Sequence, residues 1–146
     1  MTFSRSTDMK WLVSFRSGGV SVDPSAISTL LKMPATYAHR KGDVKIFRSR
    51  SGEAVTRGEW DSNMWLLESA LSSTDSLEKH LQALLRILSS RGSELRSLME
   101  QGMICDVACG LRFSSESMDA GFSLTSAMIT DLANLGLDIH FNIYAV

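Results

Sequence analysis

The sequence predicts an α+β fold of the ferredoxin-like type, in which two strand–helix–strand halves build a mainly antiparallel four-stranded sheet. Helices are expected on one face of the sheet, with a helical insertion and a short hairpin between the halves. Segments with an apolar residue at every second position alternate with segments of helical spacing. Residues 19–34 (GVSVDPSAISTLLKMP) also recur without a gap as residues 121–136 (GFSLTSAMITDLANLG), through duplication or convergence.

The first half begins with a strand at residues 10–16, whose odd-numbered residues form one apolar face. Asp23 and Pro24 predict the N-cap and the first turn of a helix, and Pro34 predicts its end. The apolar stripe of this helix consists of Val22, Ala26, Ile27, Leu30 and Leu31.

The second half repeats this order. Residues 103–113 alternate as a strand with one strongly apolar face, and Ser123 or Thr125 begins a helix that Gly136 ends. The stripe of this helix consists of Leu124, Met128, Ile129, Leu132 and Leu135. A last strand covers residues 137–146 (LDIHFNIYAV). Its inward residues are Leu137, Ile139, Phe141, Ile143 and Ala145, and its outward residues are Asp138, His140, Asn142 and Tyr144.

Further elements lie between the halves. Residues 44–57 predict a short, weakly hydrophobic hairpin that turns at residues 51–52, and residues 63–68 predict a strand with Trp65 in the core. A capping box of Asp75 and Glu78 then begins a leucine-rich helix, on which we expect His80 at the surface. The leucines at helical spacing are Leu77, Leu81, Leu84, Leu85 and Leu88. A shorter helix follows.

The composition suits a single domain. We expect residues 10–146 to form it after an N-terminal tail at residues 1–9, because 146 residues with 44% hydrophobic and 21% charged residues can bury one core. A net charge of −1 excludes a strong overall attraction to nucleic acid or to an anionic membrane. No segment has the pattern of a secretory leader or a membrane span, so we expect a cytoplasmic protein.

The two cysteines are expected to be structural. Cys105 and Cys109 fall on one face of a predicted strand, about 13 Å apart, which is too far for a disulfide or for two ligands of one zinc ion. We therefore predict buried, unreactive thiols and expect no metal or other cofactor.

Several segments together resemble one family. They are residues 22–36 (VDPSAISTLLKMPAT), the tripeptide at 41–43, residues 65–69 (WLLES) and the closing segment 122–144. In these segments the chain resembles the domain of unknown function 4279, a group of small bacterial proteins, over about residues 10–145. Most of the matching residues are packing residues and turn formers, so the resemblance implies a fold and assigns no catalytic residue.

A basic segment is one candidate binding site. Residues 39–57 carry six of the fifteen Lys and Arg residues, opposed by Asp43 and Glu53. The six are Arg40, Lys41, Lys45, Arg48, Arg50 and Arg57. Phe47 is the one aromatic residue placed to stack on a base, whereas single-strand platforms present several rings. A solvated loop or a contact with an anionic protein is therefore favoured over nucleic-acid binding.

The outward residues of the last strand are a second candidate. Asp138, His140, Asn142 and Tyr144 rise from the sheet at intervals of about 7 Å, and Asp106 and Arg112 are expected on the same open face. His140 could act as an acid or base, but no nucleophile is placed beside it. A small-molecule enzyme or ligand sensor that uses His140, Tyr144 and Arg112 is therefore an alternative interpretation.

The leading interpretation is a non-enzymatic protein-binding module, such as an immunity protein that neutralises a bacterial toxin. Trp60 follows the basic hairpin and could serve as an exposed anchor. The candidate partner-binding residues are Arg40, Lys41, Lys45, Arg48, Trp60, Arg112, His140 and Tyr144. We assign no catalytic, cofactor-binding or metal-binding residue. The edge of the last strand could also pair with a second copy of the chain, so a homodimer stays open.

Overall fold

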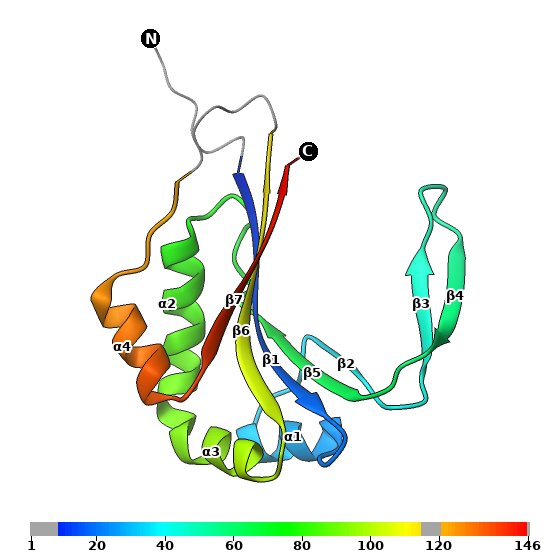
Figure 1. Cartoon of the computed structure of the whole chain (residues 1–146), viewed down its shortest axis with the longest axis horizontal. Helices are drawn as coiled ribbons and strands as arrows, with labels where there is room; N and C mark the ends of the chain where they lie inside the picture. Colours follow the sequence, from blue (N-terminus) through cyan, green and yellow to red (C-terminus); the bar gives the residue numbers. More distant parts are fainter. Residues whose placement is uncertain (1–8, 115–120, 146) are drawn as a thin grey trace.

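A computed structural model describes residues 9–114 and 121–145 (Figure 1). The elements, in chain order, are β1 (Met9–Gly19), α1 (Pro24–Leu31), β2 (Tyr37–His39), β3 (Val44–Arg48), β4 (Ala54–Glu59), β5 (Asn63–Glu68), α2 (Leu77–Leu88), the 3-10 turn η1 (Ser89–Arg91), α3 (Gly92–Glu100), β6 (Ile104–Phe113), α4 (Ser126–Asn134) and β7 (Asp138–Ala145). Most of the predicted N-terminal tail, residues 1–8, lies outside the described residues, and Met9 already belongs to β1.

The main sheet has five strands in the order β2-β5-β1-β6-β7. Neighbouring strands are antiparallel except for β6 and β7, which are parallel. The helices contribute to one hydrophobic core on one face of the sheet, and the hairpin β3–β4 stands on the other side (Figure 1). The predicted α+β class is therefore confirmed.

The ferredoxin-like plan is not confirmed. In that plan, the second strand of each half lies beside the first strand of the other half. Here β7 lies beside β6, the first strand of its own half, and β5 lies between β1 and β2. The sheet also has a fifth strand, β2. This strand was not predicted, because three residues are too few to show a periodic pattern. Because β6 and β7 are parallel and the other neighbours are antiparallel, the sheet is mixed.

The core lies between the helices and the covered face of the sheet. Trp11, Val13 and Phe15 of β1 point into it, as does Trp65 of β5, and all four are almost completely buried. The five leucines predicted on α2 are buried as well, and each burial contributes about 1.5–3 kcal/mol before entropy is subtracted. The predicted inward faces of β1 and α2 are confirmed.

The repeated segment corresponds to α1 and α4, which occupy equivalent positions of the alignment. The Asp23 carboxylate caps α1 by accepting a hydrogen bond of 2.9 Å from the Ser25 backbone N–H, next to Pro24 in the first turn. The Thr125 hydroxyl caps α4 by accepting one of 3.2 Å from the Met128 N–H. Sequence reasoning thus found both helix starts, with Thr125 as the correct one of its two alternatives.

The predicted capping box of α2 is wrong. The N-cap is Ser76, whose hydroxyl accepts a hydrogen bond from the Lys79 backbone N–H. Asp75 lies one residue outside the helix, and its carboxylate pairs instead with the Lys79 ammonium at 3.9 Å. Ser and Asp cap helices about equally well, so their order here could not be predicted from residue type.

Five further side chains differ from their predicted environment, and two of them are Ala26 of α1 and Ala145 of β7, which are exposed although they were expected to face the core. His80 is only 1% exposed although it was expected at the surface, and its ring contacts Ser69 behind the α2 leucines. Ile129 of α4 and Ile143 of β7 were expected to face the core, yet both are more than half exposed.

The cysteine prediction is confirmed. Cys105 and Cys109 are both free thiols and both buried on the covered face of β6. Burial raises the pKa of Cys105 and raises that of Cys109 to about 12. The reactive thiolate form is therefore suppressed at neutral pH.

Candidate functional site

The structure places seven of the eight predicted partner-binding residues on two surfaces. The first, the hairpin surface, consists of β2, β3, β4, the residues that join them and Trp60, which follows β4, and it carries Arg40, Lys41, Lys45, Arg48 and Trp60. The second, the sheet groove, is a hollow on the open face of the main sheet that Arg112 and Tyr144 help to line. His140 is exposed on the same face but outside the groove, four residues or about 13 Å along β7 from Tyr144.

An aromatic cluster holds the root of the hairpin. The His39 ring stacks on Trp60 with 3.9 Å between ring centroids, and its Nδ1 lies 2.8 Å from the Tyr37 hydroxyl. The centroid of the Phe47 ring lies 6.5 Å from that of Trp60, and the Lys45 ammonium lies 4.9 Å from the Trp60 ring centre. Trp60 is therefore a half-buried support for β3, not the exposed anchor that was predicted.

Polar contacts at the root fix the direction of the hairpin. Arg40 forms an ion pair of 2.6 Å with Asp23, the N-cap residue of α1, and this arginine together with Ser25 holds the pKa of the carboxyl well below its usual range. The Asn63 side chain accepts a hydrogen bond of 2.7 Å from the Lys41 N–H and donates one of 3.1 Å to the Val22 carbonyl. Arg40 is thus engaged within the chain.

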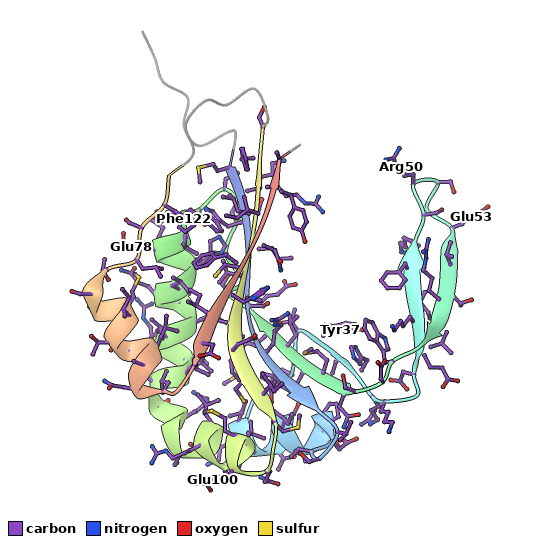
Figure 2. The ribbon with its side chains drawn as sticks, in the orientation of Figure 1. Tyr37, Arg50, Glu53, Glu78, Glu100 and Phe122 are labelled. Atoms are coloured by element: carbon purple, nitrogen blue, oxygen red, sulfur yellow. The ribbon has the colours of Figure 1, made fainter. Side chains whose placement is uncertain are left out.

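Beyond its root, the hairpin is uncovered. Figure 2 shows Tyr37 at the root and Arg50 and Glu53 at the tip, remote from the helices. The large apolar side chains of the hairpin that are at least one-third exposed are Val44, Ile46, Phe47 and Val55. A two-stranded hairpin of this kind is marginally stable by itself and has two free edges. Apolar residues on such an element are typical of a protein contact surface.

Some cations of the hairpin have partners within the chain and others have none among the described residues. Arg48 donates a hydrogen bond of 3.2 Å to the Gly52 carbonyl, and Lys45 lies over Trp60. By contrast, the charged groups of Lys41, Arg50 and Arg57 have no ion pair or hydrogen bond with any described residue. These exposed cations give the hairpin surface a net positive charge.

The sheet groove has a volume of about 590 Å³ and lies over β1, β6 and β7. Its floor is made of Ser14, Ala108 and Gly110, which are too small to fill the space above the strands. Its remaining lining residues are Lys10, Trp11, Leu12, Arg16, Leu66, Ser73, Arg112, Asn142 and Tyr144. Sequence reasoning predicted this open polar face, but it missed the small-residue floor and Lys10.

The charges on the open face are neutralised at one end only. Arg16 forms a two-pronged ion pair with Asp106, with distances of 2.8 and 2.9 Å, and this hydrogen bonding raises the pKa of Arg16. At the other end, Lys10 lies directly opposite Arg112, and the next residue across the strands is Tyr144. Neither Lys10 nor Arg112 has an ion pair with a described residue.

One hydroxyl–imidazole pair lies in the interior, away from both surfaces. The Ser69 hydroxyl and His80 Nδ1 are 2.6 Å apart, both residues are buried, and among the described residues no carboxylate is hydrogen-bonded to the imidazole. Burial lowers the pKa of His80, although the nearby Ser72 backbone and the Asp75 carboxylate oppose this effect. Within residues 9–114 and 121–145, no group of three His, Cys, Asp or Glu side chains could hold a metal ion.

The chain is a small α+β protein with a projecting hairpin and a groove on the open face of its main sheet. The chain belongs to the family described as domain of unknown function (DUF4279), whose family model matches residues 8–146. This confirms the resemblance found in the sequence. No curated protein and no solved structure matches the chain significantly. Among the described helices, none has both the length and the apolar character needed to cross a membrane.

Proposed function

We propose that this chain is a non-enzymatic protein-binding module and that the hairpin surface makes its main contact with the partner. The observation that carries the proposal is the β3–β4 hairpin itself, which projects from the sheet and leaves Val44, Ile46, Phe47 and Val55 exposed. The fold does not need these side chains for its core. An element of this kind has its exposed apolar groups stabilised when another protein covers them.

The residue types on the hairpin favour a protein partner. Aromatic residues and arginine are enriched where protein interfaces gain most of their binding energy. The hairpin surface offers Tyr37 and Phe47, together with arginines at its tip and along β4. Its free edges could also accept a strand of the partner by main-chain hydrogen bonding.

The charge of the hairpin surface favours an acidic partner. Lys41, Arg50 and Arg57 are exposed and unpaired within the described part of the chain. Complementary charge accelerates association and selects between partners. An immunity protein that neutralises a bacterial toxin needs shape and charge and no chemistry of its own, so this chain would suit that role.

Nucleic acid is a weaker candidate for the same surface. Binding of single strands depends on aromatic rings whose faces are free to stack on bases. His39 stacks on Trp60, and the Lys45 ammonium lies over the same ring, so little of the largest ring in the cluster is left for a base.

The test is complex formation with the product of the adjacent gene. We expect the two purified proteins to elute together in size-exclusion chromatography. Ile46→Asp should abolish the complex, because it places a carboxylate in the apolar contact, whereas Ile129→Asp should not. Ile129 is a matched control because it is also an exposed isoleucine, at 52% against 65%, but lies on α4. Absence of a complex, or equal loss in both variants, would contradict the proposal.

A further inference from the structure

The sheet groove differs in chemistry from the hairpin surface. Three cationic side chains line it, Lys10, Arg16 and Arg112, and none of its described lining residues is a carboxylate. Of the three, only Arg16 has an ion pair with a described residue, Asp106, which does not line the groove. Like charges directly opposite each other on neighbouring strands destabilise a sheet, so the Lys10–Arg112 pair is unfavourable unless an anion lies between them.

The groups around this pair are suited to an oxyanion. A guanidinium offers a planar fork of N–H donors that matches a carboxylate or a phosphate, and an ammonium adds three further donors. In the next strand, Tyr144 lies beside Arg112 and Asn142 lies beside Gly110. The phenol and the amide can each donate a further hydrogen bond to the same group.

The space beside the cations is larger than an inorganic ion requires. Ligand cavities in proteins commonly measure about 300–1,000 Å³, and the groove, at about 590 Å³, lies within this range. Leu12, Leu66 and the Tyr144 ring provide apolar surface next to the cationic end, and Leu12 is 62% exposed. A molecule with an apolar body attached to an anionic group would use both parts.

From these observations we propose that the sheet groove binds a small organic oxyanion, a carboxylate or phosphate carried on a compact apolar body, with its charged end between Lys10 and Arg112. The site is separate from the hairpin surface and does not depend on the function proposed above. Carboxylate and phosphate share the same donor geometry, so the choice between them is left to the experiment.

Gly110 provides a way to block the groove without damage to the fold. A Cβ atom added there would lie 3.7 Å from the Leu12 carbonyl oxygen and 3.9 Å from the Leu12 Cβ, which are ordinary contacts. Neighbours of Gly110 along β6 point into the core, so its own side of the strand faces the groove. Valine is a strong strand former, and Gly110→Val should therefore fill the floor in a folded protein.

The experiment titrates the whole chain with benzoate, phenyl phosphate and the neutral benzamide, and follows backbone amides by nuclear magnetic resonance. We expect saturable shifts at Gly110 and Arg112 with both anions, at about millimolar affinity, and none with benzamide. Tighter binding of phenyl phosphate would identify a phosphate ligand, and tighter binding of benzoate a carboxylate.

Variants complete the test. Lys10→Gln and Arg112→Gln should each weaken anion binding about tenfold or more. Gly110→Val should abolish it while the spectrum remains that of a folded protein. Arg57→Gln removes an unpaired cation from the hairpin and should change nothing. No saturable shift at about 10 mM of either anion would overturn the proposal, as would equal shifts with benzamide or equal weakening by Arg57→Gln.

Discussion

At the scale of single residues, His80 is the side chain whose environment departs most from expectation. It lies three residues after Leu77 and four before Leu84, so its position falls on the buried stripe of α2. Its Nδ1 contacts the Ser69 hydroxyl, whereas its Nε2 is buried and has no hydrogen-bond partner among the described residues. A buried imidazole of this kind is held neutral, because the charged form would be desolvated.

This environment predicts stability that depends on pH. The pKa of His80 in the folded chain lies below its ordinary value of 6.5, so the unfolded chain binds the proton more readily. The stability that the neutral His80 contributes is therefore fully present above about pH 6.5, and it is lost as the pH falls below 6.5 toward the lowered pKa of the folded chain. His39, whose pKa is also lowered mainly by burial, acts in the same direction. Urea unfolding should show lower stability at about pH 5 than at about pH 8.

His80→Asn separates the contribution of this residue. The Asn amide oxygen can replace Nδ1 as the partner of Ser69, and the side chain does not titrate. We expect the variant to lose about 1–2 kcal/mol at about pH 8 through its smaller volume, and to show a smaller loss on acidification than the parent. His140→Asn removes an exposed imidazole and is the control. A pH dependence equal to that of the parent would contradict this explanation.

At the scale of elements, one side chain joins three parts of the fold. Asn63 begins β5, accepts a hydrogen bond from Lys41 at the root of the hairpin, and donates one to Val22 just before α1. It is only 9% exposed, so water cannot easily replace either bond. The direction of the hairpin relative to the sheet depends on this residue and on the Arg40–Asp23 ion pair.

Asn63→Ala should therefore loosen the hairpin root and destabilise the chain. Leaving the Lys41 N–H and the Val22 carbonyl without their partner costs about 1–3 kcal/mol, measurable by urea unfolding. Hydrogen exchange should also accelerate at the Lys41 amide, while amides of β6 keep their relative protection. Asn142→Ala, which removes an exposed amide from β7, is the matched control. Unchanged exchange at Lys41 would show that other contacts hold the root.

The elements also show what a sequence pattern can and cannot predict. Local patterns located β1, the hairpin, and the two helices of the repeated segment, α1 and α4, because periodicity and capping depend on neighbouring residues. Strand pairing depends on contacts between distant residues, so the position of β7 beside β6 was not predictable from either strand alone. The groove was missed for the same reason: Lys10 and Arg112 become neighbours only through the register of β1 against β6.

At the scale of the whole molecule, the chain combines a layered body, made of the main sheet and the helices, with an appendage, the β3–β4 hairpin. Every residue of the buried core belongs to the body, and none belongs to β3 or β4. The strands that flank the appendage, β2 and β5, are already antiparallel neighbours. We therefore expect the body to supply most of the folding free energy and the hairpin to contribute little to stability.

This division predicts that the appendage can be removed. The backbone of Trp60 exchanges hydrogen bonds of 2.8 Å with Gly42 and Asp43, so the two segments already run side by side at the root. Replacing residues 44–59 by Asn-Gly, which favours a two-residue turn, should give a folded chain. Its melting temperature should stay within about 5 °C of the parent, because no core residue is removed.

The same deletion distinguishes the two binding surfaces. The shortened chain should lose the complex with the adjacent gene product, because the exposed apolar residues of the hairpin are gone, yet it should bind benzoate or phenyl phosphate as the parent does. The sheet groove keeps all its lining residues in this variant, since none of them belongs to residues 44–59. A deletion variant that fails to fold would show that the hairpin supports the body and is not an appendage.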